Sequence, residues 1–113
     1  MRPEEAQTIL DEIEQNTRDD DILHDLYQDL LVTSLRYARL RAEWFVAGLE
    51  ARQEMDARRT AAHDALIDAC NILSRAMHQR GKPTAWRRQV GENRKEIGDF
   101  ACWLHAVMGI RAR

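Results

Sequence analysis

Helical periodicity that continues from residue 20 to residue 80 without a proline limits the fold of this chain more than any other feature. Apolar side chains recur there at steps of three and four residues, as they do along one face of an α-helix. A single helix of this length would be a rod of about 90 Å with its apolar stripe exposed to water. We therefore predict a helical hairpin over residues 20–79. Its reversal is expected in the weakly hydrophobic stretch 50–59, with Asp56 as the N-cap of the second helix.

Composition excludes several other classes of protein. The chain has 113 residues, of which 44% are apolar, enough for one modest core but not for two ordinary domains. Five glycines and two prolines are too few for a turn-rich β-sandwich. No apolar run reaches the roughly 18 residues of a membrane span, and the first residues lack the apolar centre of a secretory signal. We expect one all-α domain over residues 1–113, an antiparallel helical hairpin or bundle of three to four helices with one long helix.

This domain is expected to have four parts. They are a short N-terminal helix with its linker (1–18), the hairpin (20–79), a basic loop (80–91) and a C-terminal helix (91–110). Gly81 and Pro83 favour the end of the hairpin. Broad apolar stripes and three tryptophans predict a homo-oligomer, because such surfaces are usually covered. Cys70 and Cys102 lack the spacing of a metal or redox motif and are expected in the core. Gly98, inside the last helix, indicates close approach by another backbone or a ligand.

Charge is distributed unevenly along the chain. Residues 1–29 carry ten acidic and two basic side chains, a net charge of −8. Residues 30–113 carry nine acidic and fifteen basic side chains, a net charge of +6. The acidic segment is expected either to pack on a basic face, of its own subunit or of a neighbour, or to stay solvated. The most basic stretch is 80–95, where six of sixteen residues are Arg or Lys.

The densest group of polar residues lies between residues 57 and 75. On a helix, Arg59 and His63 share a face, and a polar ridge runs beside the apolar stripe. The ridge consists of Thr60, Asp64, Asp68, Asn71 and Arg75. One interpretation is a helix surface with ordinary side-chain pairs. The other is a half-buried site in which Arg59 and Arg75 bind an anion that His63 orients. The spacing by itself favours the first interpretation.

The basic loop 80–91 is a second candidate for anion binding. Arg87 and Arg88 are suited to neutralise phosphate, and Trp86 to stack on a base. Trp86 is equally suited to cap the core. A net charge of −2 argues against binding of long nucleic acid, and a small nucleotide fits better. The sequence contains no metal-ligand signature, and we expect neither a metal nor a cofactor.

Arg58 and His63 have the spacing Arg-x4-His. This short pattern resembles the motif of HEPN-type helical ribonucleases, in which the arginine holds phosphate and the histidine assists attack by the 2′-hydroxyl. The resemblance implies a ribonuclease. In that family, however, the motif usually lies in the last helix, whereas here a further helix is predicted after it.

Two segments, RRTAAHDALIDACNILSR (58–75) and RKEIGDFA (94–101), resemble a family of small bacterial and phage helical proteins of unknown function. The more specific part reads AHDALID-x-x-NI-x-x-R, and the family implies no activity. It implies one polar unit in which Asp68 or Asp99 pairs with Arg75 or Arg94. That unit comprises His63, Asp64, Asp68, Asn71, Arg75, Arg94 and Asp99.

In size and helix order, the chain also resembles phage proteins that sequester cyclic-nucleotide messengers of bacterial immunity. Those proteins oligomerise and bind their ligands between subunits through Arg, Lys and aromatic residues. This resemblance, which is one of architecture, implies a cytoplasmic protein of a bacterial host cell that acts in phage counter-defence.

These observations lead to the hypothesis of a non-enzymatic, oligomeric protein that binds a small phosphorylated ligand such as a cyclic nucleotide. No catalytic residue is assigned, because no nucleophile or general base stands out. The expected ligand contacts are Arg58, Arg59, His63, Asp68, Asn71, Arg75, Trp86, Arg87, Arg88 and Arg94. The alternative is a protein-binding inhibitor or adaptor that acts through the acidic residues 1–29. A third hypothesis is the HEPN-like ribonuclease.

Overall fold

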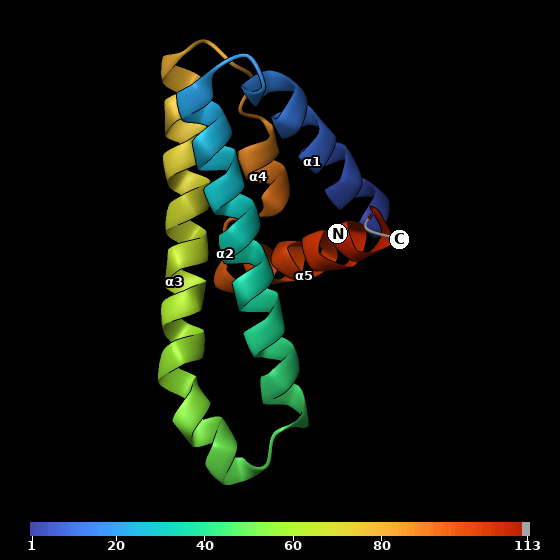
Figure 1. The fold of residues 1–113 in the computed structure, drawn as a ribbon, viewed down its shortest axis with the longest axis vertical. Helices are drawn as coiled ribbons and strands as arrows, with labels where there is room; N and C mark the ends of the chain where they lie inside the picture. Colours follow the sequence, from blue (N-terminus) through green and yellow to red (C-terminus); the bar gives the residue numbers. More distant parts are fainter. Residues whose placement is uncertain (112–113) are drawn as a thin grey trace.

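The computed structural model describes residues 1–111, and side chains as far as residue 108. This part of the chain is all-α, as predicted, and contains no strand. Its helices are α1 (Pro3–Thr17), α2 (Asp21–Val46), α3 (Leu49–Gln79), α4 (Trp86–Val90) and α5 (Arg94–Arg111). The long helices α2 and α3 form the predicted antiparallel hairpin (Figure 1).

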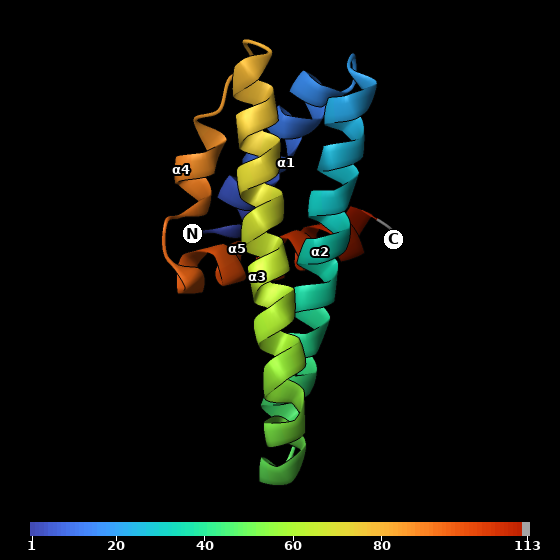
Figure 2. The same ribbon diagram turned by 90° about the vertical axis from the view of Figure 1, so that its left-hand side faces the viewer.

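The three other helices lie on one side of this hairpin. α1 and α5 both pack against α2, and they also pack against each other (Figure 1). Figure 2 views the molecule from the hairpin side, with α1, α4 and α5 behind α2 and α3. The hairpin therefore has an inner face, covered by the other helices, and an outer face that nothing in the described chain covers.

The hydrophobic core fills the space between the inner face and the three covering helices. Its fully buried large side chains include Ile9 and Leu10 of α1, Leu23 and Leu30 of α2, Leu66 and Leu73 of α3, Trp86 of α4, and Phe100 and Leu104 of α5. Burying each of these side chains contributes about 1.5–3 kcal/mol. The weakly apolar α1 is thus stabilised mainly by docking, since an isolated helix of this length is marginal in water.

The hairpin reverses earlier than the sequence predicts. α2 ends at Val46 and α3 begins at Leu49, so the reversal occupies Ala47 and Gly48 rather than residues 50–59. Asp56 lies inside α3, and its predicted role as an N-cap is wrong. Arg52 stabilises the early reversal, because its Nε and Nη2 donate to the carbonyl oxygens of Trp44 and Phe45, both at 2.9 Å. These bonds satisfy carbonyl groups that the end of α2 leaves without an intrahelical partner.

The expected basic loop contains a short helix. α4 spans five residues between two glycines of positive φ, Gly81 at 71° and Gly91 at 115°. The last helix begins at Arg94 rather than at residue 91. Asn93 and Glu96 set this start: the Asn93 Oδ1 accepts from the Glu96 amide at 2.9 Å, and the Glu96 carboxylate accepts weakly from the Asn93 amide. This reciprocal pair is a capping box, which fixes where a helix starts.

The two cysteines lie in different environments. Cys70 is buried as predicted, and burial raises the pKa of its thiol to about 11. Cys102 is only half-buried, which corrects the expectation that it belongs to the core. Its thiol lies 3.6 Å from Nη1 of Arg41. Burial also raises the pKa of Cys102, and the nearby guanidinium opposes that shift.

Candidate functional site

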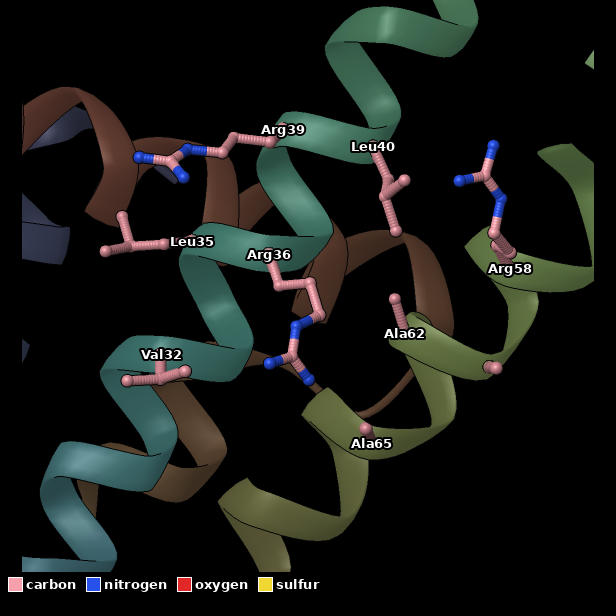
Figure 3. A pocket seen from close by; sticks show the side chains of 9 residues that line it. Val32, Leu35, Arg36, Arg39, Leu40, Arg58, Ala62 and Ala65 are labelled. Carbon is pink, nitrogen blue, oxygen red and sulfur yellow. The ribbon is translucent and has the colours of Figure 1, made fainter.

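A groove with a volume of about 680 Å³ runs along the outer face between α2 and α3 (Figure 3). Aliphatic side chains form much of its wall, among them Leu40 on α2, and Ala62 and Ala65 on α3. The alanines leave space that larger residues would fill. The groove therefore exists because α3 presents small side chains along the line where α2 packs against it.

Three arginines line this groove. Figure 3 shows Arg36 extending from α2 towards Ala65 of α3, and Arg58 standing on α3 opposite Leu40. Arg39 also lines the groove, but its side chain points away from α3 in the same view. We call these arginines the groove arginines. Arg58 belongs to the predicted ligand contacts, whereas the predicted site does not include Arg36 and Arg39.

Five cations of the described residues pair with carboxylates, whereas the groove arginines, like Arg75 and Arg88, do not. Arg41 pairs with Asp99 at 3.0 Å and Arg80 with Asp20 at 2.8 Å. Within the described part of the chain, no hydrogen bond or ion pair is found for the side chains of Arg36, Arg39 and Arg58. Positive charge without a compensating carboxylate attracts anions, and guanidinium groups bind phosphate through paired N–H donors.

The groove continues along the hairpin into a second hollow of about 420 Å³. The two hollows share Val32, Arg36 and Ala65. Two carboxylates, those of Asp29 and Asp68, line the second hollow. The outer face thus has a basic half, which carries the groove arginines, and an acidic half. Asp68 is one of the predicted ligand contacts, but it lies in the acidic half.

The structure separates Arg59 from the other predicted anion contacts. The guanidinium of Arg59 lies 4.3 Å from the centre of the Trp44 ring, and its Nη2 is 3.9 Å from the Asp56 carboxylate. Arg75 lies sixteen residues further along α3, which is about 24 Å at the helical rise. The hypothesis that Arg59 and Arg75 bind one small anion together is therefore wrong.

His63 has structural contacts on the inner side of α3. Its Nε2 bonds the Arg94 carbonyl oxygen at 2.7 Å, and its ring lies 4.7 Å from that of Tyr37. Burial lowers the pKa of His63 below its ordinary value of 6.5, and the charges of Arg94 and Arg59 act in the same direction. Arg58 faces the groove instead. Arg58 and His63 therefore do not share a site, which removes the geometric support for the ribonuclease motif.

Two of the remaining predicted contacts, Arg87 and Asn71, fasten the segment 86–94 to α3. The Nε of Arg87 donates to Asn71 Oδ1 at 3.0 Å, and its Nη1 donates to the Gly91 carbonyl oxygen at 2.7 Å. Arg75 donates to the backbone carbonyl of the same Asn71 at 3.3 Å. Arg88 is exposed on α4. These bonds support the structural interpretation of the polar ridge for Asn71 and Arg87.

Two further predictions about this region are wrong. Trp86 is fully buried in the core, so its ring has no face available for stacking on a ligand. The pairing of Asp68 or Asp99 with Arg75 or Arg94, implied by the resemblance, is not found. Arg94 pairs with Asp64 at 2.8 Å, and Asp99 pairs with Arg41 of α2.

The acidic N-terminal segment packs in part on a basic region of its own chain. Asp19 pairs with Lys82 at 3.0 Å and Asp20 with Arg80, across the end of the hairpin. The Lys82 ammonium lowers the pKa of Asp19 by hydrogen bonding and charge. The adaptor hypothesis for residues 1–29 stays a prediction, with two of its carboxylates engaged in these pairs.

Two other features are absent from the described residues. No group of three or more His, Cys, Asp and Glu side chains between residues 1 and 111 is arranged to hold a metal ion. None of the helices in the same range combines the length and hydrophobicity that crossing a bilayer requires.

Comparison of the chain with protein-family models, with curated proteins and with solved structures gave no significant match. The resemblances drawn from the sequence therefore stay predictions.

Proposed function

We propose that this protein binds a small phosphorylated ligand in the groove between α2 and α3, without chemical conversion of that ligand. The observation that carries the proposal is the pair Arg36 and Arg58, which line the groove from its two helices, have no carboxylate partner in the described residues and lie beside an apolar wall. A nucleotide messenger is the leading candidate, because it combines phosphate with a planar base whose faces pack well on apolar side chains.

The dimensions and chemistry of the groove support this choice. Small-molecule sites usually have volumes of about 300–1,000 Å³ and combine apolar walls with a few polar groups. Arg36 and Arg58 line the groove from opposite helices, and their guanidinium groups lie towards different ends of it (Figure 3), which suits a ligand long enough to reach both. Leu40 and the alanines of α3 offer apolar contact for a base or sugar. The protein would sequester such a ligand rather than modify it.

The test is a binding screen with AMP, ATP, cyclic AMP, cyclic di-AMP and cyclic di-GMP as probes. Native mass spectrometry detects stoichiometric adducts, and calorimetric titration then gives the dissociation constant. We expect at least one probe to bind, and its affinity to fall about tenfold or more in Arg36→Ala and in Arg58→Ala, because hydrogen bonds to charged groups contribute about 1.5–3 kcal/mol. Binding should also weaken as ionic strength rises.

Arg88→Ala is the matched control. It removes an exposed arginine from α4, outside the groove. The proposal predicts wild-type affinity for this variant. Absence of an adduct with every probe, or equal affinities in wild type, Arg36→Ala and Arg58→Ala, would contradict the proposal. Loss of binding in Arg88→Ala alone would instead locate the ligand at the basic segment around α4.

A further inference from the structure

Two exposed apolar side chains lie on the outer face of the hairpin. Val32 of α2 is 52% exposed and Ile72 of α3 is 47% exposed, and both line the second hollow of the outer face. Between them lie small residues of α3, including Ala65 and Ala69. Small side chains allow a neighbouring helix to approach closely, and an apolar stripe on an otherwise polar helix pair favours burial.

Charge on this face is sorted by position. Arg36, Arg39 and Arg58 lie in the basic half, and Asp29 and Asp68 lie in the acidic half. As for the arginines, no ion pair or hydrogen bond within residues 1–108 engages the carboxylate of Asp29 or Asp68. A face with opposite charge at its two ends is complementary to its own copy when that copy is turned end for end.

We propose that a second copy of this chain packs on the outer face, with the two hairpins antiparallel about a two-fold axis near Val32 and Ala65. Such an interface is isologous, so each contact occurs twice. Val32 and Thr33 lie midway along α2 between Asp29 and Arg36. An axis at that point places Asp29 of one copy opposite Arg36 of the other, with Val32 of both copies between these pairs.

The same arrangement regulates access to the groove. Partner carboxylates and ligand phosphates both require the groove arginines, so a second copy and an anionic ligand exclude one another. Ligand binding therefore dissociates the dimer, and a higher protein concentration weakens the apparent ligand affinity. This competition rests on the proposed function, whereas the self-association does not.

Sedimentation velocity on ligand-free protein tests the self-association. Wild type is expected to dimerise. Asp29→Arg and Arg36→Asp should each raise the dimer dissociation constant at least tenfold, because each puts like charges opposite one another at two symmetric positions. An equimolar mixture of the two variants should recover the dimer, since both pairs then regain opposite charges. Glu5→Arg, which makes the same charge change at an exposed position of α1 outside this face, should leave dimerisation unchanged.

Each outcome decides the proposal. A wild-type protein that stays monomeric throughout the concentration series overturns it, as does a dimer that both single reversals leave unaffected or a mixture that fails to recover. Circular dichroism of each variant separates loss of dimer from loss of fold. Because these measurements contain no ligand, failure of the nucleotide screen leaves their result intact. A monomer that still binds nucleotide through Arg36 would overturn only the dimer.

Discussion

At the scale of single residues, the contact between Gly98 and Tyr37 sets how closely α5 approaches α2. A Cβ atom on Gly98 would lie 2.7 Å from Tyr37 Oη and 3.1 Å from its Cε1. Gly98 is itself buried in the interior of α5. The sequence predicts close approach at this glycine by another backbone or a ligand, whereas the structure places the Tyr37 side chain there. Tyr37 is 61 residues away and is identified only by the crossing of the two helices.

Gly98→Ala should therefore destabilise the protein, although alanine favours a helix over glycine by about 1 kcal/mol. Overfilling a packed site usually costs about 1–3 kcal/mol. The expected net effect is a lower free energy of unfolding, measured by denaturant titration followed by circular dichroism. The Tyr37→Phe background is the control, because it removes the oxygen nearest the new methyl group. Gly98→Ala should be milder there, and a stabilised Gly98→Ala protein would disprove the steric account.

At the scale of helices, the sequence predicted the elements that local signals define. Pro3 begins α1, and the Asp20 side chain caps α2 by accepting from the Leu23 amide at 3.1 Å. The reversal at Ala47 and Gly48 was missed, since the weakly hydrophobic stretch 50–59 reads as a turn. That stretch is polar because this end of the hairpin extends past α5 into solvent (Figure 1).

The candidate site was predicted less well than the helices. Arg58 was predicted as a ligand contact because it lies in a dense polar segment. Arg36 and Arg39 were not predicted, because they are spaced along an ordinary amphipathic helix. Only the packing of α2 on α3 brings Arg36 and Arg58 to one groove. Conversely, Arg87 in the basic loop and Asn71 in the polar ridge were predicted as ligand contacts, because both side chains are suited to bind an anion. Their bond to each other depends on how α4 folds back onto α3.

The role of α4 can be tested with two adjacent arginines. Arg87→Ala removes half-buried hydrogen bonds to Asn71 and to the Gly91 carbonyl oxygen. Since hydrogen bonds to charged groups contribute about 1.5–3 kcal/mol, we expect a loss of about 1–3 kcal/mol in the free energy of unfolding. Arg88→Ala, on the exposed side of the same helix, should change it by less than about 0.5 kcal/mol. Equal effects in thermal or denaturant unfolding would contradict a structural role for Arg87.

At the scale of the whole molecule, the covering helices support only part of the hairpin. Between residues 42 and 60, Met55 is the sole buried side chain, while α3 from Ala62 onwards contributes a buried residue at nearly every turn. Local stability follows buried apolar contact, so the two parts of α3 should open at different free energies. The part of α3 that precedes Ala62 depends on its pairing with α2 and on the hydrogen bonds that Arg52 makes to the end of α2.

Hydrogen exchange measured by mass spectrometry should reveal this difference. We expect amide protection in residues 49–58 to be at least tenfold lower than in residues 62–77, because the first segment opens locally and the second only with the core. Arg52→Ala should lower protection further in residues 44–52 and leave residues 62–77 unchanged. Uniform protection along α3 would show that the hairpin opens as one unit.

The packing of α1 against α5 also has a consequence for synthesis of the chain. These helices are the first and last of the described residues, and α5 supplies Phe100 and Leu104 to the core that α1 helps to close. At about 5–20 residues per second, roughly 5–20 s separate translation of α1 from translation of this part of α5. During that interval the inner face of the growing hairpin has no lasting cover. Nascent chains of this protein therefore expose apolar surface that chaperones recognise, and a ribosome that pauses before α5 prolongs this exposure.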